Sequence, residues 1–380
     1  MPTLHRLDTQ EGLDHRIDHV RGVVPAPVRP APRRLGAVLG AVAVATVLLL
    51  WLGLDLHLGL AVTGAFLLYL ALTYVGFRVA AGARVATDRL MRGLLYGAFV
   101  VALLPLCSLL WTVVTLGGAR VVNPDFLLQT MNGVTGLHDQ ATQQQGQLFI
   151  GGAYHAIVGT LLITGAATLI SVPVGLLTAI YLVEYAGRSR LAHVIRFFVD
   201  VMTGIPSIVA GLFAFALWAV VFGIGTKDGM AGAVALSVLM IPTVVRNSEE
   251  MLRIVPNELR EASLALGVPK WRTIVRVVLP TAASGLASGV TLAIARVIGE
   301  TAPLLVAVGY ARALNTNLLE GPMNTLAVYA YYMFTKPLSP AYRDPSIERA
   351  WAAALLLVLV VVALNLSARL IARFFAPTKR

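Results

Sequence analysis

Charged residues are scarce in this sequence of 380 residues. Asp, Glu, Lys and Arg make up 13% of it, whereas soluble domains average about 25%. Hydrophobic residues make up 57%, and several apolar stretches exceed the length of about 18 residues from which a membrane-spanning helix is expected. The composition excludes an ordinary soluble domain and predicts an all-α, polytopic membrane protein.

Cysteine and the common catalytic motifs are also missing or nearly so. The single cysteine, Cys107, excludes a disulfide within the chain and a cysteine-rich metal site. The sequence has no Gly-x-x-x-x-Gly-Lys-Ser/Thr phosphate loop, no His-Glu-x-x-His zinc motif and no serine nucleophile elbow. We therefore predict that the chain is not an enzyme, holds no metal or cofactor and does not bind ATP through such a loop.

The positive charge of the chain is unevenly placed. The formal net charge is +11, but Lys and Arg cluster in short segments between the apolar stretches instead of forming a nucleic-acid-binding surface. With the N-terminus in the cytoplasm, 23 of the 30 basic residues fall on the cytoplasmic side, as the positive-inside rule requires. The sequence thus predicts a membrane protein in contact with lipid and not with nucleic acid, with both termini cytoplasmic.

The apolar stretches divide the chain into eight predicted spans. The first two form a hairpin after a basic, proline-rich cytoplasmic tail at 1–34, and a short cytoplasmic tail at 376–380 closes the chain. A count of six or ten spans leaves the orientation unchanged, so the count stays open. The predicted spans are Leu35–Leu54, Leu58–Ala80, Gly93–Leu116, Ala153–Val183, Val201–Phe222, Met230–Val245, Thr281–Val308 and Ala350–Ile371.

Prolines interrupt three of these spans. Pro173 lies in the fourth span, Pro206 in the fifth and Pro242 in the sixth. Each lacks the backbone N–H that the helical hydrogen-bond ladder needs, so we expect kinks there. The sequence leaves open whether these residues act as hinges or only shape the helices.

A cation and an anion stand close together inside the seventh predicted span. Arg296 lies near the middle of Thr281–Val308, where an arginine costs about 3 kcal/mol on insertion scales. Glu300 follows four positions later, so on a helix the two side chains share a face. Because the desolvation cost of such a pair is not reliably offset, we expect a site that handles an anion. A structural ion pair without a ligand is the alternative.

A polar, helix-rich segment, Arg246–Pro280, follows the sixth span. Asn257 is predicted to cap a helix over Glu258–Leu266, and Gly267 is predicted to end it in the left-handed conformation. Pro269 is placed to begin a second short helix, before Pro280 opens the next span. Two short helices with exposed leucines indicate a docking element for another protein. An amphipathic loop on the membrane surface is the alternative.

The stretch Glu261–Pro280 closely resembles the EAA motif of type I ABC importer permeases. It departs from that motif at Ser263, which replaces an alanine, and at Val277, which replaces an isoleucine. The resemblance covers about residues 150–375 and implies a pair of coupling helices that insert into a groove of an ATPase subunit. The coupling residues implied in this way are Glu261, Ala262, Gly267, Leu279 and Pro280.

Four shorter stretches resemble the Pst-type phosphate permeases, and the A-type member of that pair more than the C-type. They are Thr203–Val209, Val245–Leu252, Arg296–Leu304 and Pro322–Leu326. This resemblance implies that Arg296, Glu300 and Arg246 lie on a phosphate pathway. An ordinary basic anchor at the inner end of a span is the alternative for Arg246. Glu300 either holds Arg296 when no anion is bound or competes with phosphate for it.

The resemblance also implies a domain organisation. A MetI-like importer core is expected at 153–375, with coupling helices at 246–280, after a first core span and outer loop at 93–152. The hairpin at 35–92 is an addition whose role the family does not supply.

Together these features predict a transmembrane subunit of an ATP-driven phosphate importer that works by alternating access. The implied partners are a second, paralogous permease subunit, two ATPase subunits that hold ATP and Mg²⁺, and an extracytoplasmic phosphate-binding protein facing 117–147 and 309–346. One alternative is an importer of another oxyanion, such as phosphonate or sulfate. Another is an ATP-independent secondary anion transporter, which would not need Glu261–Pro280.

Overall fold

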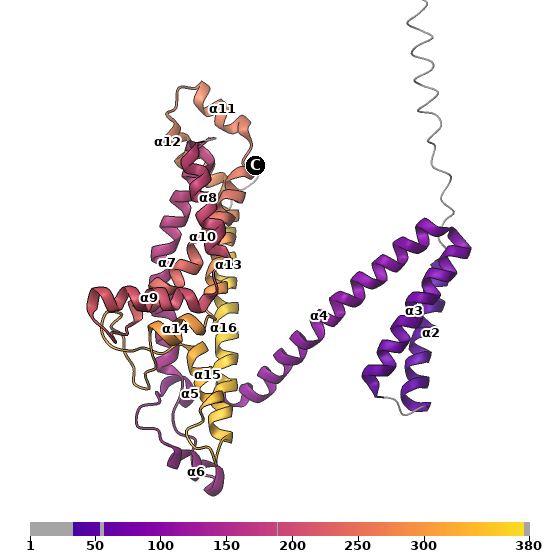
Figure 1. Cartoon of the computed structure of the whole chain (residues 1–380), viewed down its shortest axis with the longest axis horizontal. Coiled ribbons are helices and arrows are strands. Elements are labelled where there is room, and N and C mark those ends of the chain that lie inside the picture. Colours follow the sequence, from indigo (N-terminus) through magenta and orange to yellow (C-terminus); the bar gives the residue numbers. More distant parts are fainter. Residues whose placement is uncertain (1–32, 54–56, 188, 376–380) are drawn as a thin grey trace, which may run out of the picture. The chain divides into compact units, whose positions relative to one another are not determined.

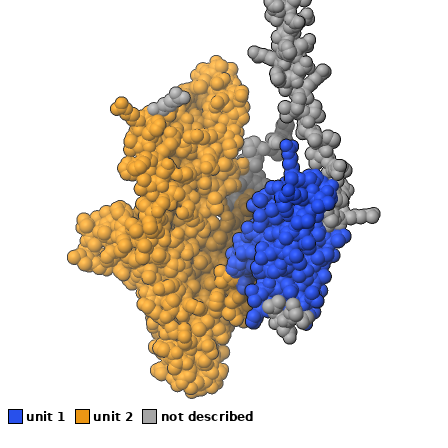
Figure 2. Space-filling model, turned by 45° about the vertical axis from the view of Figure 1, so that its right-hand side comes forward, with its two compact units in different colours: residues 1–108 blue, residues 109–380 orange. Residues whose placement is uncertain are grey.

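The chain is helical throughout the part that the structure describes. The computed structural model describes residues 33–53, 57–187 and 189–375, and these form helices and loops without a strand (Figure 1). The predicted tails at 1–34 and 376–380 lie outside these residues, apart from Arg33 and Arg34. The described chain divides into two compact units, Met1–Ser108 and Leu109–Arg380 (Figure 2).

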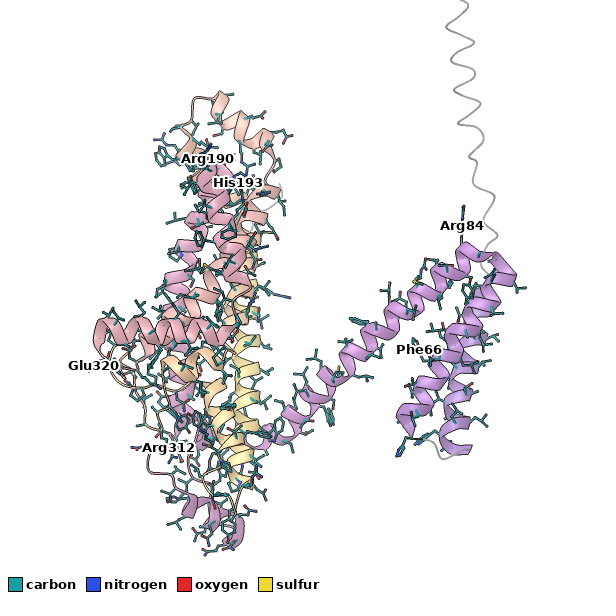
Figure 3. The ribbon with its side chains drawn as sticks, in the orientation of Figure 1. Phe66, Arg84, Arg190, His193, Arg312 and Glu320 are labelled. Carbon is teal, nitrogen blue, oxygen red and sulfur yellow. The ribbon has the colours of Figure 1, made fainter. Side chains whose placement is uncertain are left out.

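Unit 1 contains the predicted N-terminal hairpin. Helix α2 (Arg33–Leu48) continues as a short π-helical turn to Gly53, and α3 (Leu58–Ala81) follows. Gly82 has φ of +95° and leads directly into α4 (Ala83–Val121), which crosses into unit 2. Because this turn is so tight, α4 begins well before the predicted span Gly93–Leu116. Phe66 of α3, labelled in Figure 3, packs over Gly97 of α4: an added Cβ at Gly97 would lie 2.3 Å from the Phe66 ring.

Unit 2 is built around four long helices. Helix α10 packs against both α7 and α13, and α16 packs against α13. Small and aliphatic side chains from these helices form the core, including Ile163, Leu236 and Ala293, each with 0% exposure. Pro173 and Pro242 lie inside α7 and α10, which continue through them. The bounds are α7 (Tyr154–Ile180, with a π-helical turn to Tyr185), α10 (Gly229–Ile254), α13 (Leu279–Val297) and α16 (Asp344–Phe375).

The fifth predicted span is not a single helix. Helices α8 (Arg190–Thr203) and α9 (Ser207–Phe222) meet at an angle of 108°, so the predicted span at Val201–Phe222 contains a sharp break. Gly204 and Pro206 stand at the break, where proline cannot donate to the helical ladder. Helix α9 then turns away from α8 (Figure 1) and packs against α14 (Ala302–Ala307).

The number of membrane crossings follows from these helices. Six described helices are long and apolar enough to cross a membrane, and a seventh crossing results if α8 and α9 count as one broken span. The apolar part of the first predicted span, Gly36–Leu52, is shorter than these. The chain is therefore a multi-pass, all-α membrane protein in which the first and fifth predicted spans differ from plain crossings.

The two ends of unit 2 carry different short elements (Figure 1). One end holds α11 (Asn257–Ala265) and α12 (Lys270–Thr273), which belong to the predicted coupling segment. The opposite end holds α5 (Pro124–Leu128) and α6 (Gly136–Gln145), from the predicted outer loop. Helix α15 (Leu326–Thr335) connects this end to α16.

Candidate functional site

Arg296 stands at the end of a helix and not in its middle. Helix α13 ends at Val297, and the Glu300 N–H donates to the Val297 carbonyl at 3.1 Å in the turn that follows. The helix ends here because Pro303 cannot donate to the carbonyl four residues earlier, at Gly299, and its ring would clash there. The prediction that Arg296 and Glu300 share a helix face is therefore wrong.

The two side chains are also unpaired among the described residues. Neither Arg296 nor Glu300 forms a hydrogen bond or ion pair with another described side chain. Arg296 is exposed on the surface of this chain, and Glu300 is half-buried. In the last turn of α13, the arginine lies where the helix dipole favours a cation. Its guanidinium thus keeps all five N–H donors available to an anion or to a second subunit.

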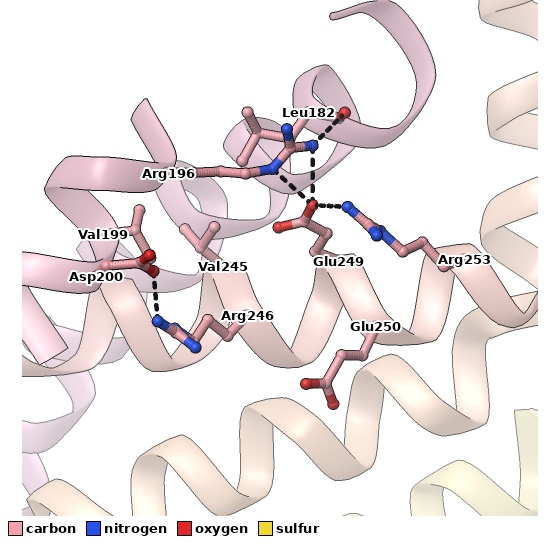
Figure 4. A pocket seen from close by; sticks show the side chains of 9 residues that line it. All are labelled: Leu182, Arg196, Val199, Asp200, Val245, Arg246, Glu249, Glu250 and Arg253. Carbon is pink, nitrogen blue, oxygen red and sulfur yellow. Dashed lines mark hydrogen bonds and ion pairs between the residues drawn. The ribbon is translucent and has the colours of Figure 1, made fainter. Parts of the chain in front are cut away.

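Arg246 lies in a charged pocket between α8 and α10. Its guanidinium forms an ion pair with the Asp200 carboxylate of α8 (Figure 4). Helix α10 continues past the predicted inner end of the sixth span at Val245, to Ile254. Arg246 therefore lies inside a helix, and its role on the phosphate pathway and the alternative of a basic anchor at a span end both stay predictions. The pocket is lined by Leu182, Arg196, Val199, Asp200, Val245, Arg246, Glu249, Glu250 and Arg253.

Glu249 forms the second link between these helices. Its carboxylate accepts hydrogen bonds from Arg196 of α8 and from Arg253 of its own helix, at 3.0 Å and 2.5 Å. The Glu249 side chain is only 14% exposed, whereas Arg253 is 59% exposed. Sequence reasoning missed Arg196 and Asp200. The one available signal was that Asp200 is an acidic residue at the border of a strongly apolar stretch.

Arg246 and Arg296 lie at different levels of the bundle. Asn247, next to Arg246, donates from Nδ2 to the Gly289 carbonyl of α13 at 3.2 Å. An added Cβ at Gly289 would lie 2.8 Å from the Asn247 Cβ, so α10 and α13 nearly touch there. Arg296 lies about two turns further along α13, which is about 10 Å at 1.5 Å per residue. The structure therefore does not bring the two arginines into one pocket.

The predicted coupling segment is anchored to the bundle by Arg260. This guanidinium donates to Glu184 at 2.9 Å and 3.0 Å and to the carbonyls of Leu252 and Val255 at 2.8 Å and 2.6 Å. The Asn257 side chain accepts from Arg260 at 3.1 Å and makes no helix-capping hydrogen bond, so its predicted role as a cap is wrong. The contacts of Arg260 therefore attach α11 to the bundle.

The elbow between α11 and α12 follows the prediction more closely. Gly267 has φ of +74°, the left-handed conformation in which glycine has no Cβ penalty. Glu261 and Ala262 are exposed on α11, next to apolar side chains that the chain leaves uncovered. These exposed apolar residues are Leu259, Leu264, Leu266 and Trp271.

Leu279 and Pro280 lie within a continuous helix. Helix α12 runs through a π-helical turn, Ile274–Val278, directly into α13. Pro280 lies in the first turn of α13, as expected, but that helix follows the preceding turn without a break. The wider π-helical turn directly before Pro280 accommodates a residue that cannot donate in the ladder.

The two predicted outer segments pack together at the opposite end of unit 2. Asp139 of α6 forms an ion pair at 2.7 Å with Arg349 of α16, and both side chains are fully buried. The Arg312 carbonyl accepts from the Met131 N–H at 3.1 Å, and burial raises the pKa of the nearby Tyr310 to about 12. Residues 122–152 and 309–346 therefore form one folded end and not two separate loops. Within the described ranges, no group of three or more His, Cys, Asp or Glu could hold a metal ion.

Comparisons with known proteins agree with this architecture. The family described as "Binding-protein-dependent transport system inner membrane component" matches residues 171–380. The phosphate transport system permease protein PstA 1 of Mycobacterium tuberculosis is 48% identical over 285 residues, which cover 75% of this chain and 87% of that protein. The chain belongs to the PstA-type permeases of this family.

More distant relatives extend the comparison. The PstA permease of Haemophilus influenzae is 38% identical over 74% of this chain and 93% of its own length. Among solved structures, the inward-facing methionine ABC transporter MetNI aligns with 60% of this chain and 95% of that chain, at 21% identity and a TM-score of 0.46.

The region matched by the family lies wholly in unit 2. It begins inside α7 and holds Arg246, the segment Glu261–Pro280 and Arg296. Residues 1–108 of unit 1 lie outside it. As a member of this family, the chain is a multi-pass permease subunit of a binding-protein-dependent transport system, and not the subunit that carries out catalysis.

Proposed function

We propose that this chain is a transmembrane subunit of an ATP-driven importer of inorganic phosphate. The observation that carries the proposal is its membership of the PstA-type permeases, with 48% identity to a phosphate transport permease over 75% of the chain. The rigidly anchored elbow of α11 and α12 supports an ATP-driven mechanism, because a self-sufficient transporter has no need for an exposed docking element of this kind.

In this proposal α11 and α12 are the coupling helices. Their exposed leucines and Trp271 enter a groove of an ATPase subunit, which holds ATP and Mg²⁺. Arg260 transmits the movement, since it ties α11 to Glu184 and to the end of α10. Pro206, at the 108° bend, is the strongest candidate for a hinge, with Pro173 and Pro242 as further candidates inside continuous helices. The termini lie on the same cytoplasmic side as α11.

The phosphate pathway runs past charges at two levels. Arg296 takes the anion at the outer level, where Glu300 either holds the guanidinium when no anion is bound or competes with phosphate for it. Arg246 takes the anion about 10 Å closer to the cytoplasm. Arg296 is exposed and forms no ion pair or hydrogen bond with the residues that the structure describes, so a second, paralogous permease subunit completes the site. A bidentate guanidinium suits the oxygens of phosphate. The binding protein docks on the folded end formed by α5, α6 and residues 309–346.

Two experiments test the partners and the substrate. Affinity purification of the tagged chain from mild-detergent membranes is expected to recover an ATPase and a second permease in stoichiometric amounts. Uptake of radioactive phosphate by cells is expected to resist a tenfold excess of sulfate or phosphonate. Sulfate or phosphonate as the better competitor would refute phosphate as the substrate. Ion-driven phosphate uptake by the purified chain alone would refute ATP coupling.

A further inference from the structure

We propose that Asp200 is the resting counter-ion of Arg246, and that phosphate reaches this guanidinium only when the Asp200–Arg246 ion pair opens. This inference rests on the proposed function. Asp200 is not among the residues that the sequence motifs indicated. We give it a positioning role, because its carboxylate acts on the anion through Arg246 and does not contact the anion itself.

The two links between α8 and α10 differ in how firmly they are held. Glu249 is 14% exposed and accepts from both Arg196 and Arg253, and Arg196 also donates to the Leu182 carbonyl at 3.2 Å. That link joins one largely buried carboxylate to two arginines. In the Asp200–Arg246 link the side chains are 61% and 49% exposed, and neither has another partner among the described residues. The Asp200 link is therefore the exchangeable one.

Arg246 has donors to spare in this arrangement. Only one of its nitrogens, an Nη, contacts Asp200, although a guanidinium carries five N–H groups. The pocket beside it holds three arginines and three carboxylates, so its formal charge is balanced while Asp200 stays in place. When the Asp200 carboxylate leaves, the pocket gains a positive charge beside free donors. An exposed ion pair contributes little stability, so a divalent oxyanion can displace the carboxylate.

Opening of this pair also releases α8 beside its bend. Asp200 is one turn before Gly204, where the chain turns by 108° into α9. Val199, which directly precedes Asp200 in the sequence, packs with Val245 and Ala192 in a small buried cluster. Asp200 thus holds the last turn of α8 against α10, directly next to the break. Binding of the anion by Arg246 is therefore coupled to movement at the break between α8 and α9.

The test compares charge and shape at position 200 in the complete transporter complex. Binding of radioactive inorganic phosphate to the purified complex, without its binding protein, is measured by equilibrium dialysis. ATP-driven uptake is measured in proteoliposomes. For Asp200→Asn we expect at least threefold tighter phosphate binding together with a reduced maximal uptake rate. Asp200→Glu restores both values, and Arg246→Gln loses the binding gain when combined with Asp200→Asn.

The control is Asp88→Asn. Asp88 forms an exposed ion pair with Arg92 in unit 1, with 52% and 57% exposure, so the same chemical change is made far along the chain from the pocket. Uptake and binding of this variant should equal those of the wild type. A purely structural role for Asp200 would lower complex yield and uptake without tighter binding.

The outcomes separate the two proposals. If the wild-type complex takes up phosphate and Asp200→Asn binds it no more tightly than wild type, the counter-ion role is overturned and the proposed function stands. If the wild-type complex takes up no phosphate with ATP, the proposed function falls, and the role of Asp200 falls with it.

Discussion

Replacement of Asp139 by asparagine should loosen the end of unit 2 that holds α5 and α6 more than the loss of an exposed carboxylate there would. The Asp139 carboxylate accepts from Arg349 at 2.7 Å and from the Ser346 hydroxyl at 2.8 Å, and all three side chains are fully buried. Arg349 also donates to the Ile150 carbonyl at 2.8 Å and lies over the Phe149 ring. Asp139→Asn keeps the shape of this site but leaves the guanidinium charge buried without a counter-ion.

The expected cost follows from that burial. Removal of one partner from a buried ion pair costs about 3–5 kcal/mol, which is a factor of about 10² to 10⁴ in the equilibrium for local opening. Hydrogen exchange of α6 and of the first turns of α16 should therefore accelerate by a similar factor. Thermal denaturation in detergent should shift downward. Removal of both charges, with Asp139→Leu and Arg349→Met, should recover much of the loss, because no uncompensated charge remains.

Asp344→Asn serves as the matched control at the same end. The Asp344 carboxylate accepts from Gln143 at 2.8 Å but is exposed. Loss of the Asp344 charge should lower the free energy of unfolding by about 1 kcal/mol at most. It removes a favourable interaction with the helix dipole in the first turn of α16 and an exposed contact with Gln143. Equal exchange rates in Asp139→Asn and Asp344→Asn would refute the view that a buried charge pair holds this end together.

Two further predictions concern a closely packed glycine of α7 and the elbow between α11 and α12. Gly159→Ala on α7 should destabilise the protein by about 1–3 kcal/mol in thermal denaturation, because the new Cβ would lie 2.0 Å from the Asn324 carbonyl oxygen; Gly165→Ala, with open space on the same helix, should be neutral or mildly stabilising. Gly267→Asp and Glu261→Lys in the coupling elbow should leave the amount of complex in the membrane unchanged but uncouple ATP hydrolysis from uptake. Normal transport in these last two variants would argue against docking of the ATPase there.

Elements controlled by local sequence were predictable. The apolar stretches predicted the long helices, because in lipid the backbone N–H and C=O groups must form their hydrogen bonds within the chain. The left-handed Gly267 was predicted from its position after a helical pattern, and φ of +74° confirms it. These features depend on a few neighbouring residues, and the sequence contains all of them.

Elements decided by tertiary contacts were not predictable in this way. A kink at Pro206 was expected from the sequence, but Val201–Phe222 has the composition of one span and contains no signal for a bend of 108° or for the packing of α9 against α14. The end of α13 at Val297 was missed because hydropathy treats Gly299 and Pro303 as part of one apolar run.

Charge pairs between distant parts of the chain were missed for a different reason. Asp139 and Arg349 pair across 210 positions of sequence, and Asp200 and Arg246 across 46. A single sequence contains no signal for which acid meets which base. Arg296 was found because it stands in an apolar stretch and Arg246 through the family resemblance, but Asp200 was not recognised as a partner.

The most direct test of the account is ATP-driven uptake of radioactive phosphate by proteoliposomes that contain this chain, its ATPase and its second permease. The wild-type complex with its binding protein should accumulate phosphate only when ATP is supplied. Arg296→Gln should assemble normally but lower uptake at least about tenfold, because a charge-assisted contact to the anion contributes about 1.5–3 kcal/mol. Wild-type uptake by Arg296→Gln would contradict the assignment of the pathway, and phosphate uptake without ATP would contradict the function itself.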